Sequence, residues 1–297
     1  MSANTLSWII IAVLGILILM VLFFFGDRFL KRTNISLNIG QFDFPTPLKR
    51  SWVVFIAILL GISWLPIAVF TETPLVMEWF KSISSDTLSP WELRSIPRLL
   101  LGLPFCLFVI PLILRIKPEN YREFLQASGF ISFKRDGSLL TCTMVVSTLL
   151  LSVLSQNSFT NLIDILNPFT NTWTWLADIQ APLFEELLFR GIILGVLLKY
   201  LNFWQAAGLA SLLFGVIHIF TGGLFIFIQS TLFALFLYSI LRVLTGSIWS
   251  GVFVHFVGNA AGIPLFIAYL ITLSVAFALL YRRGQKIKSQ AQHPLSP

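Results

Sequence analysis

The chain has 297 residues, of which 57% are hydrophobic and only 11% are charged. A soluble domain is typically about 25% charged, so this composition excludes an ordinary soluble globule and predicts an all-α, polytopic membrane protein with about eight to nine transmembrane helices. The formal net charge of +7 is better explained by loops that face an anionic cytoplasmic leaflet than by nucleic acid, which we do not expect as a partner.

Four apolar runs in the first half of the chain predict membrane spans, at about 7–25, 52–70, 99–114 and 139–154. The first run lacks a basic segment before it and a small-residue cleavage site after it, so we expect a retained span rather than a signal peptide. Aromatic and polar residues are interleaved between residues 115 and 138. This pattern predicts either a short amphipathic segment on the membrane surface or a plain polar loop. Residues 1–154 are expected to form an N-terminal membrane region without an assigned role.

The second half of the chain predicts five further spans. The fifth begins either near Trp173 or near Pro182, because proline is favoured in the first turn of a helix and disfavoured in its interior. The other four are expected at about 203–220, 224–243, 246–259 and 264–281, with a turn at Gly222-Gly223 between the sixth and the seventh. Residues 155–281 are predicted to form one membrane domain, and residues 282–297 a basic, disordered tail.

The distribution of Lys and Arg gives the nine spans an orientation. With the N-terminus outside, sixteen of these residues lie in inside loops or the tail, and three lie outside. Such a bias is typical of cytoplasmic loops, so we expect an integral membrane protein with its N-terminus outside and its C-terminus in the cytoplasm.

One stretch in the fifth span, residues 181–191, combines three charges with an apolar background. Charged residues at bilayer depth are costly and are usually paired and functional. In a helix, Glu186 and Arg190 are four residues apart and share a face, whereas Glu185 points roughly 100° away. One carboxylate is therefore expected to be neutralised by the arginine while the other is aimed elsewhere. The sequence has no Asp or Glu after Glu186, so any acid chemistry in the last third must use this pair.

Two histidines and one asparagine add further polar groups in later spans. His218 ends Phe214-Gly215-Val216-Ile217-His218, and His255 lies four residues before Asn259. Residues four apart share a helical face. Each of these groups would be expensive alone in lipid, so we expect one shared polar site rather than separate buried polar residues.

Such a site supports hydrolysis of an acyl bond. Glu185 could deprotonate a water held by His218 and return the proton to the leaving amine, while His255 and Asn259 donate to the oxyanion. Alternatively, Glu185, His218 and His255 could ligate zinc, which would acidify the water. The His-Glu-x-x-His and Gly-x-Ser-x-Gly motifs are absent from the sequence, and no pair of intramembrane aspartates occurs.

The ordered set Glu185-Glu186-x-x-x-Arg190, Phe214-x-x-x-His218 and His255-x-x-x-Asn259 resembles the CPBP (CAAX protease and bacteriocin-processing) family, also called Abi. The resemblance covers about residues 173–262 and implies a helical intramembrane protease, either glutamate-type or metal-dependent. It implies that Glu185 activates the water, that Glu186, Arg190 and Phe214 support it, and that His218, His255 and Asn259 bind the water or stabilise the oxyanion. It further implies a prokaryotic plasma membrane as the location and a peptide or membrane protein as the substrate.

The resulting hypothesis is an intramembrane endopeptidase that cleaves a peptide bond near the surface of the lipid bilayer or within it, with zinc as a possible cofactor. The first rival is a non-enzymatic scaffold or immunity factor that binds a partner peptide or helix, in which the polar groups only hold spans five, six and eight together. A proton-coupled transporter is a further alternative, since intramembrane Glu and His also form proton relays. The oligomeric state is not predicted.

Overall fold

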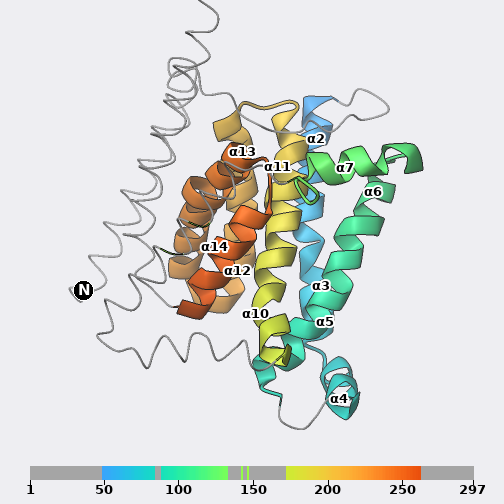
Figure 1. Ribbon diagram of the computed structural model, residues 1–297, viewed down its shortest axis with the longest axis vertical. Coiled ribbons are helices and arrows are strands. Elements are labelled where there is room, and N and C mark those ends of the chain that lie inside the picture. The colour runs from blue at the N-terminus through green and yellow to red at the C-terminus, as the bar shows by residue number, and fades with distance from the viewer. Residues whose placement is uncertain (1–48, 84–87, 133–141, 143–145, 147–171, 262–297) are drawn as a thin grey trace, which may run out of the picture.

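The computed structural model describes residues 49–83, 88–132, 142, 146 and 172–261 (Figure 1). Every regular element in these residues is a helix, which confirms the all-α prediction. The spans predicted at 7–25 and 264–281 and the tail at 282–297 lie outside the described residues, as does nearly all of the span predicted at 139–154.

The first described span consists of α2 (Arg50–Ile62) and α3 (Trp64–Thr71). Together they form a run of 22 residues that is long and apolar enough to cross a membrane, as predicted for 52–70. The short helix α4 (Pro74–Ile83) follows at the far end of this span.

The chain then returns through α5 (Pro90–Pro104), η1 (Phe105–Val109) and α6 (Ile110–Ile113). The span begins earlier than the predicted residue 99, because Ser89 and Glu92 form a capping box. The Ser89 hydroxyl accepts a hydrogen bond from the Glu92 backbone N–H, while the Glu92 carboxylate accepts one from the Ser89 N–H at 2.7 Å. These bonds satisfy backbone donors that a helix start otherwise leaves without partners.

A short amphipathic helix, α7 (Tyr121–Ala127), follows the 3-10 turn η2 (Pro118–Asn120). The segment is thus a helix with one buried side, because α7 packs Phe124 and Ala127 against the helical bundle, and its predicted place on the membrane surface stays a prediction. The bundle also holds the end of α7 by polar contacts. Arg242 Nη2 donates to the Ala127 carbonyl at 2.5 Å, and Trp249 Nε1 donates to the Phe130 carbonyl at 2.7 Å.

The charged stretch lies on one continuous helical path made of α10 (Thr172–Glu185), η4 (Glu186–Ile193) and α11 (Leu194–Leu198). The chain is already helical at Thr172, which agrees with a start near Trp173 rather than near Pro182, and Pro182 lies in the helix interior. The η4 segment is a π-helix. This form is rare in proteins overall, but where it occurs it is frequently at a functional site. At 1.5 Å per residue, Glu185 is about 20 Å from either end of the described path, near its middle.

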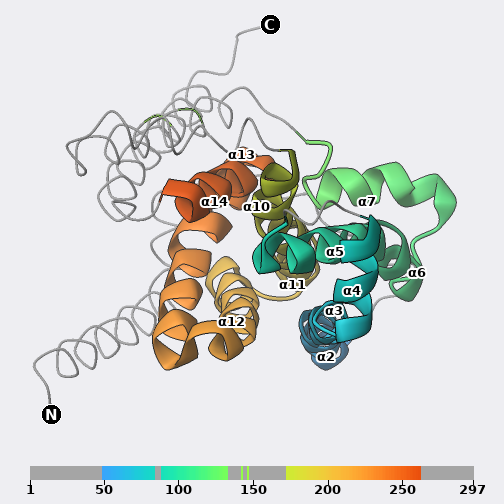
Figure 2. The ribbon, with the colours of Figure 1, turned by 90° about the horizontal axis from the view of Figure 1, so that it is seen from below.

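The next element, α12 (Phe203–Phe233), reverses direction at Gly223, whose φ is +67°. Gly215 packs so tightly on the returning arm that a Cβ there would lie 2.9 Å from the Phe227 carbonyl oxygen. Figure 2 shows the two arms joined at a corner. The turn predicted at Gly222-Gly223 is therefore confirmed. The returning arm continues through η5 (Ala234–Ser239) and α13 (Ile240–Thr245), and α14 (Trp249–Ala261) then crosses back.

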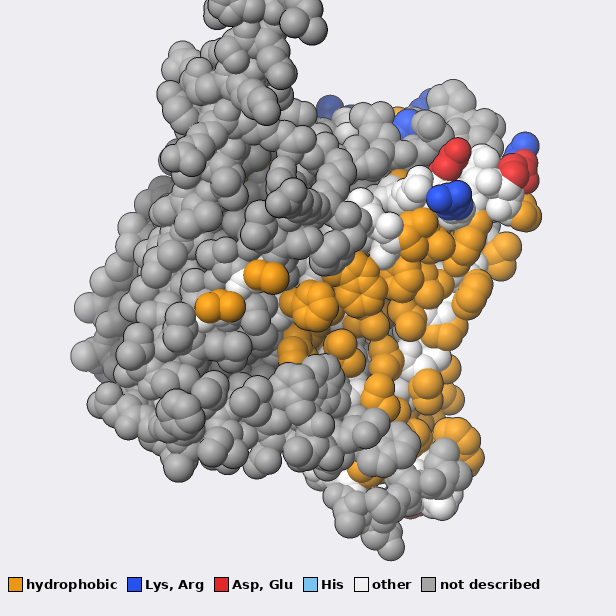
Figure 3. All heavy atoms as spheres, viewed as in Figure 1, with side chains coloured by type: hydrophobic (Ala, Val, Ile, Leu, Met, Phe, Trp, Pro, Cys, Tyr) orange, Lys and Arg blue, Asp and Glu red, His pale blue; other side chains and the backbone are white. Residues whose placement is uncertain are grey.

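The described residues contain three helices that are long and apolar enough to cross a membrane, at Arg50–Thr71, Glu92–Ile113 and Gly223–Val243. This is fewer than the eight to nine predicted, because part of the chain is not described and because the charges of the fifth span and the shortness of others leave them outside such a definition. Apolar side chains cover the visible outer face of this bundle, with charged residues gathered near one end (Figure 3). Leu100, Phe108 and Leu112 are among the exposed apolar side chains of the described residues. A surface of this kind suits lipid, so the protein is an integral membrane protein.

Four of the described basic residues that were predicted to lie inside belong to, or directly follow, helices whose ends share one side of the bundle (Figure 1). Arg50 begins α2, Arg115 follows α6, Lys199 follows α11 and Arg242 lies in α13. The alternation of the described spans therefore agrees with the predicted topology. Which side faces the cytoplasm stays a prediction.

Candidate active site

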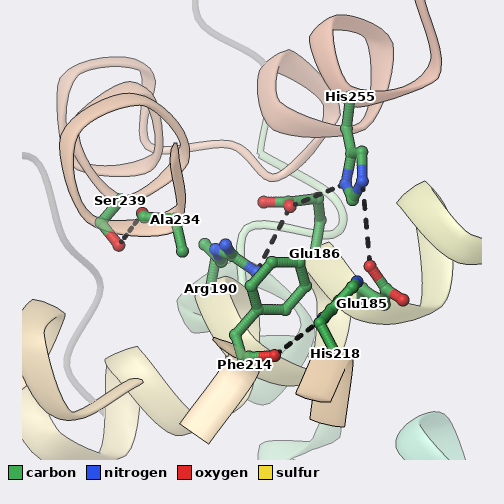
Figure 4. A network of polar contacts seen from close by, with 8 residues as sticks. All are labelled: Glu185, Glu186, Arg190, Phe214, His218, Ala234, Ser239 and His255. Carbon is green, nitrogen blue, oxygen red and sulfur yellow. Dashed lines mark hydrogen bonds and ion pairs between the residues drawn. The ribbon is translucent and has the colours of Figure 1, made fainter. Parts of the chain in front are cut away.

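The buried pair Glu186 and Arg190 belongs to a polar cluster in the middle of the helical path made of α10, η4 and α11. Arg190 Nη1 lies 3.4 Å from Glu186 Oε1, and the two side chains are each only 1% exposed. The pairing follows from their spacing of four residues, as predicted. Glu185, the next residue back, turns its carboxylate away from this pair (Figure 4).

His255 joins the two glutamates from the neighbouring helix α14 (Figure 4). Its Nδ1 donates to Glu186 Oε1 at 3.3 Å, and its Nε2 lies 3.8 Å from Glu185 Oε2. A carboxylate oxygen can only accept, so the hydrogen bond to Glu186 requires a proton on Nδ1, and the other nitrogen, Nε2, faces Glu185. The structure thus brings together three of the residues predicted for the site.

Gly251 allows α14 to approach the glutamates so closely. A Cβ built on Gly251 would lie 2.6 Å from Glu186 Oε2 and 3.1 Å from its Cδ. Real Cβ atoms essentially never come this near another heavy atom, so any side chain here would displace the carboxylate or the helix.

We expect Gly251→Ala to lower kcat strongly, because a displacement of about 1 Å at such a site can cost 10²-fold in rate. Gly208→Ala is the matched control, since a Cβ at Gly208 meets nothing within 4 Å. Peptide cleavage and thermal unfolding of the two variants in detergent check the prediction. Equal activities in both variants would mean that the approach of α14 to Glu186 is not needed.

The Phe214-x-x-x-His218 motif lies on the first arm of α12 and faces the same cluster. His218 Nδ1 donates to the Phe214 carbonyl at 2.9 Å, which fixes the ring one turn further along the helix. The Phe214 ring lies 4.5 Å from the His218 ring and 6.2 Å from the His255 ring, measured between centroids. Its centroid is also 4.1 Å from the Arg190 guanidinium carbon, a cation–π distance.

The last predicted residue, Asn259, belongs to α14, one turn after His255. Its side chain lies outside the described residues. Its predicted role as a donor to an oxyanion therefore stays a prediction.

The cluster contains polar atoms that the protein itself does not satisfy. Within the described residues, one oxygen each of Glu185 and Glu186 and all three guanidinium nitrogens of Arg190 are buried without a hydrogen-bond partner. The 3.4 Å contact between Arg190 and Glu186 is an ion pair rather than a hydrogen bond of good geometry. Buried polar groups normally have partners, so the carboxylate oxygens call for water or substrate.

A metal centre is supported less well by the same geometry. In the part of the chain that the structure describes, no group of three or more His, Cys, Asp or Glu side chains is arranged to hold a metal ion. The predicted zinc ligands Glu185, His218 and His255 therefore do not fit a three-ligand site in this arrangement, since zinc needs donors at about 2.0–2.2 Å from one point. Metal dependence stays an untested prediction.

Two residues at the cluster were missed from the sequence. Tyr238 stacks on His255, and Gly251 makes room for Glu186. Gly251 could have been found, because it lies four residues before His255 and thus on the same helical face. The only signal for Tyr238 was a single phenol in an apolar run.

Comparison with known proteins points to the same region. Residues 167–261 match the Rce1-like family, described as type II CAAX prenyl endopeptidase Rce1-like. A second similarity is to the "Putative membrane peptidase YdiL" of Bacillus subtilis (strain 168), with 32% identity over 84 residues. That stretch covers 28% of this chain and 33% of the relative, so the chain spans about a third of the curated protein it matches. No solved structure matches the chain.

The family match contains every motif residue from Glu185 to Asn259. Together with the similarity to YdiL, it confirms the resemblance to CPBP-family proteases that the three motifs indicated.

Proposed function

We propose that this protein is an intramembrane endopeptidase in which Glu185 activates a water molecule to hydrolyse a peptide bond. The observation that carries the proposal is the convergence of Glu185, Glu186, Arg190 and His255 in the middle of an apolar bundle. Similarity to a type II CAAX prenyl endopeptidase family and to a membrane peptidase supports the reaction class.

The gap between Glu185 and His255 suits the nucleophile. Glu185 Oε2 and His255 Nε2 are 3.8 Å apart, too far for a direct hydrogen bond. A water beside the line that joins them can lie about 2.8 Å from both atoms. Glu185 takes a proton from this water while the water oxygen attacks the carbonyl carbon of the peptide bond. Glu185 then returns the proton to the nitrogen of the leaving amine as the C–N bond breaks.

The other residues act around this step. Glu186 accepts a hydrogen bond from the His255 Nδ1–H and so fixes the ring, while Arg190 balances the buried charge of Glu186. His218 is assigned to hold the attacking water together with His255 Nε2, and Asn259 to stabilise the oxyanion, for which the loss of one donor typically costs about 10²–10³-fold in kcat. Of the two catalytic schemes, the donor geometry favours the glutamate-type scheme over zinc.

The position of the cluster along its helix supports a proposal for the substrate class. A cluster about 20 Å from either end of its helix accepts a peptide segment or membrane protein that enters from the bilayer. The matched family is described by the prenyl CAAX endopeptidase activity, so a lipid-modified peptide is the first probe to use.

The test uses the full chain in proteoliposomes with two peptides, a prenylated Cys-aliphatic-aliphatic-X reporter and a pool of unmodified apolar peptides. Mass spectrometry detects new termini. We expect cleavage of at least one kind of peptide, at a defined bond. Folded protein that cleaves neither the reporter nor any member of the pool would overturn the proposed activity in favour of a non-enzymatic scaffold.

A further inference from the structure

The ring of Tyr238 lies against the histidine of the proposed site. Tyr238 belongs to the π-helical segment η5 and is only 5% exposed. Its ring centroid is 4.8 Å from that of His255, and the two ring planes differ by 20°. The two rings are thus stacked face to face over a short distance. Nothing in the three sequence motifs includes this residue.

The same phenol also faces Arg190. The guanidinium carbon lies 5.1 Å from the Tyr238 ring centroid and 4.1 Å from that of Phe214. Phe214 in turn meets His255 at 6.2 Å with its ring nearly perpendicular, at 77°. Two aromatic rings therefore contact both partners of the Glu186 carboxylate, the cation and the imidazole.

These aromatic contacts matter because hydrogen bonds alone hold Arg190 and His255 only weakly. The Arg190 nitrogens make no hydrogen bond within the described residues, and His255 has one of 3.3 Å at Nδ1. The χ2 torsion of histidine has a broad distribution, so one such hydrogen bond still allows the imidazole to rotate about χ2. A flat ring packed on its face blocks the rotation that would carry Nε2 away from Glu185.

The local backbone presents Tyr238 in this direction. Ser239 Oγ donates to the Ala234 carbonyl at 2.8 Å, five residues earlier, which is the spacing of a π turn (Figure 4). This bond stabilises the segment that carries the phenol next to the cluster.

We infer that Tyr238 is a positioning residue of the peptidase site, whose aromatic ring, rather than its hydroxyl, holds His255 and Arg190 in register with Glu185 and Glu186. The inference rests on the proposed function. Tyr238 acts through His255 and Arg190 and has no bond-making role of its own.

The test compares Tyr238→Phe, Tyr238→Leu and Tyr238→Met by kcat and KM on the peptide that the wild type cleaves. We expect the Phe variant to keep the wild-type kcat, because it keeps the ring. The Leu and Met variants should lose about 10²-fold in kcat with an unchanged KM, since misplacing a catalytic group by about 1 Å costs this much. The Met variant fills the core without a flat ring, which covers the case in which Leu impairs folding.

Tyr121→Leu is the control for loss of a tyrosine that packs on the same core away from the site. It should lower the unfolding temperature and leave kcat near that of the wild type. A Leu or Met variant with wild-type kcat would overturn the inference, and so would a Phe variant as impaired as Leu, because the hydroxyl would then be the active part. An active Glu185→Gln protein would instead overturn the proposed function, which keeps the two failures distinguishable.

Discussion

Replacement of Glu185 by Gln is expected to lower kcat by about 10²–10⁴-fold, the usual contribution of a general base, while the protein stays folded. The amide has the size of the carboxylate but cannot take a proton from water. Because Glu185 Oε2 has no hydrogen-bond partner among the described residues, the substitution removes little that holds the fold together. Cleavage of the reporter or pool peptide and thermal unfolding of the same sample measure the two effects.

Glu123→Gln is the matched control, because Glu123 is exposed on α7, away from the site. It should be fully active and equally stable. Full activity of Glu185→Gln would contradict the proposed base. If Glu185→Gln instead unfolded, the glutamate would be part of the interhelical packing, as the scaffold hypothesis holds.

The second large effect is expected for stability rather than rate. Arg190→Met should destabilise the protein by about 3–5 kcal/mol, the cost of breaking a buried ion pair by removing one partner. Glu186 is buried and would be left without its cation, and the contacts of the guanidinium with Phe214 and Tyr238 would also be lost. The free energy of unfolding in detergent, from denaturant titration, measures this loss.

The double variant Glu186→Gln/Arg190→Met tests the cause. Neutralising both partners should recover much of the lost stability, because no uncompensated buried charge remains. The two substitutions would then be strongly non-additive, as expected for residues in direct contact. If the two residues are not coupled, their effects on the free energy of unfolding add. The double variant would then be less stable than Arg190→Met by the full effect of Glu186→Gln alone.

Much of the site was predictable because helical periodicity is a local rule. The spacing of Glu186 and Arg190 predicted their ion pair, and the adjacent position of Glu185 predicted a carboxylate aimed elsewhere. The four-residue spacing of Phe214 and His218 likewise placed both on one face, and the structure joins them by a hydrogen bond. The turn near Gly223 followed from glycine's access to positive φ.

The contacts between helices could not be predicted in the same way. That His255 lies between the two glutamates depends on how closely α14 approaches η4, which the missing side chain of Gly251 decides. Tyr238 reaches His255 from a π-helical segment, whose geometry has no simple sequence signature. The early start of α5 is due to the capping box of Ser89 and Glu92. The prediction placed these residues in a polar loop because it followed the apolar run alone.

The source of the oxygen in the product tests the central claim most directly. Cleavage carried out in water enriched in ¹⁸O should place one ¹⁸O atom in the new carboxyl group of the amino-terminal fragment, and Glu185→Gln should form this labelled fragment about 10²–10⁴-fold more slowly. Products that carry no label, or labelled products formed by Glu185→Gln at the wild-type rate, would contradict a water molecule activated by Glu185.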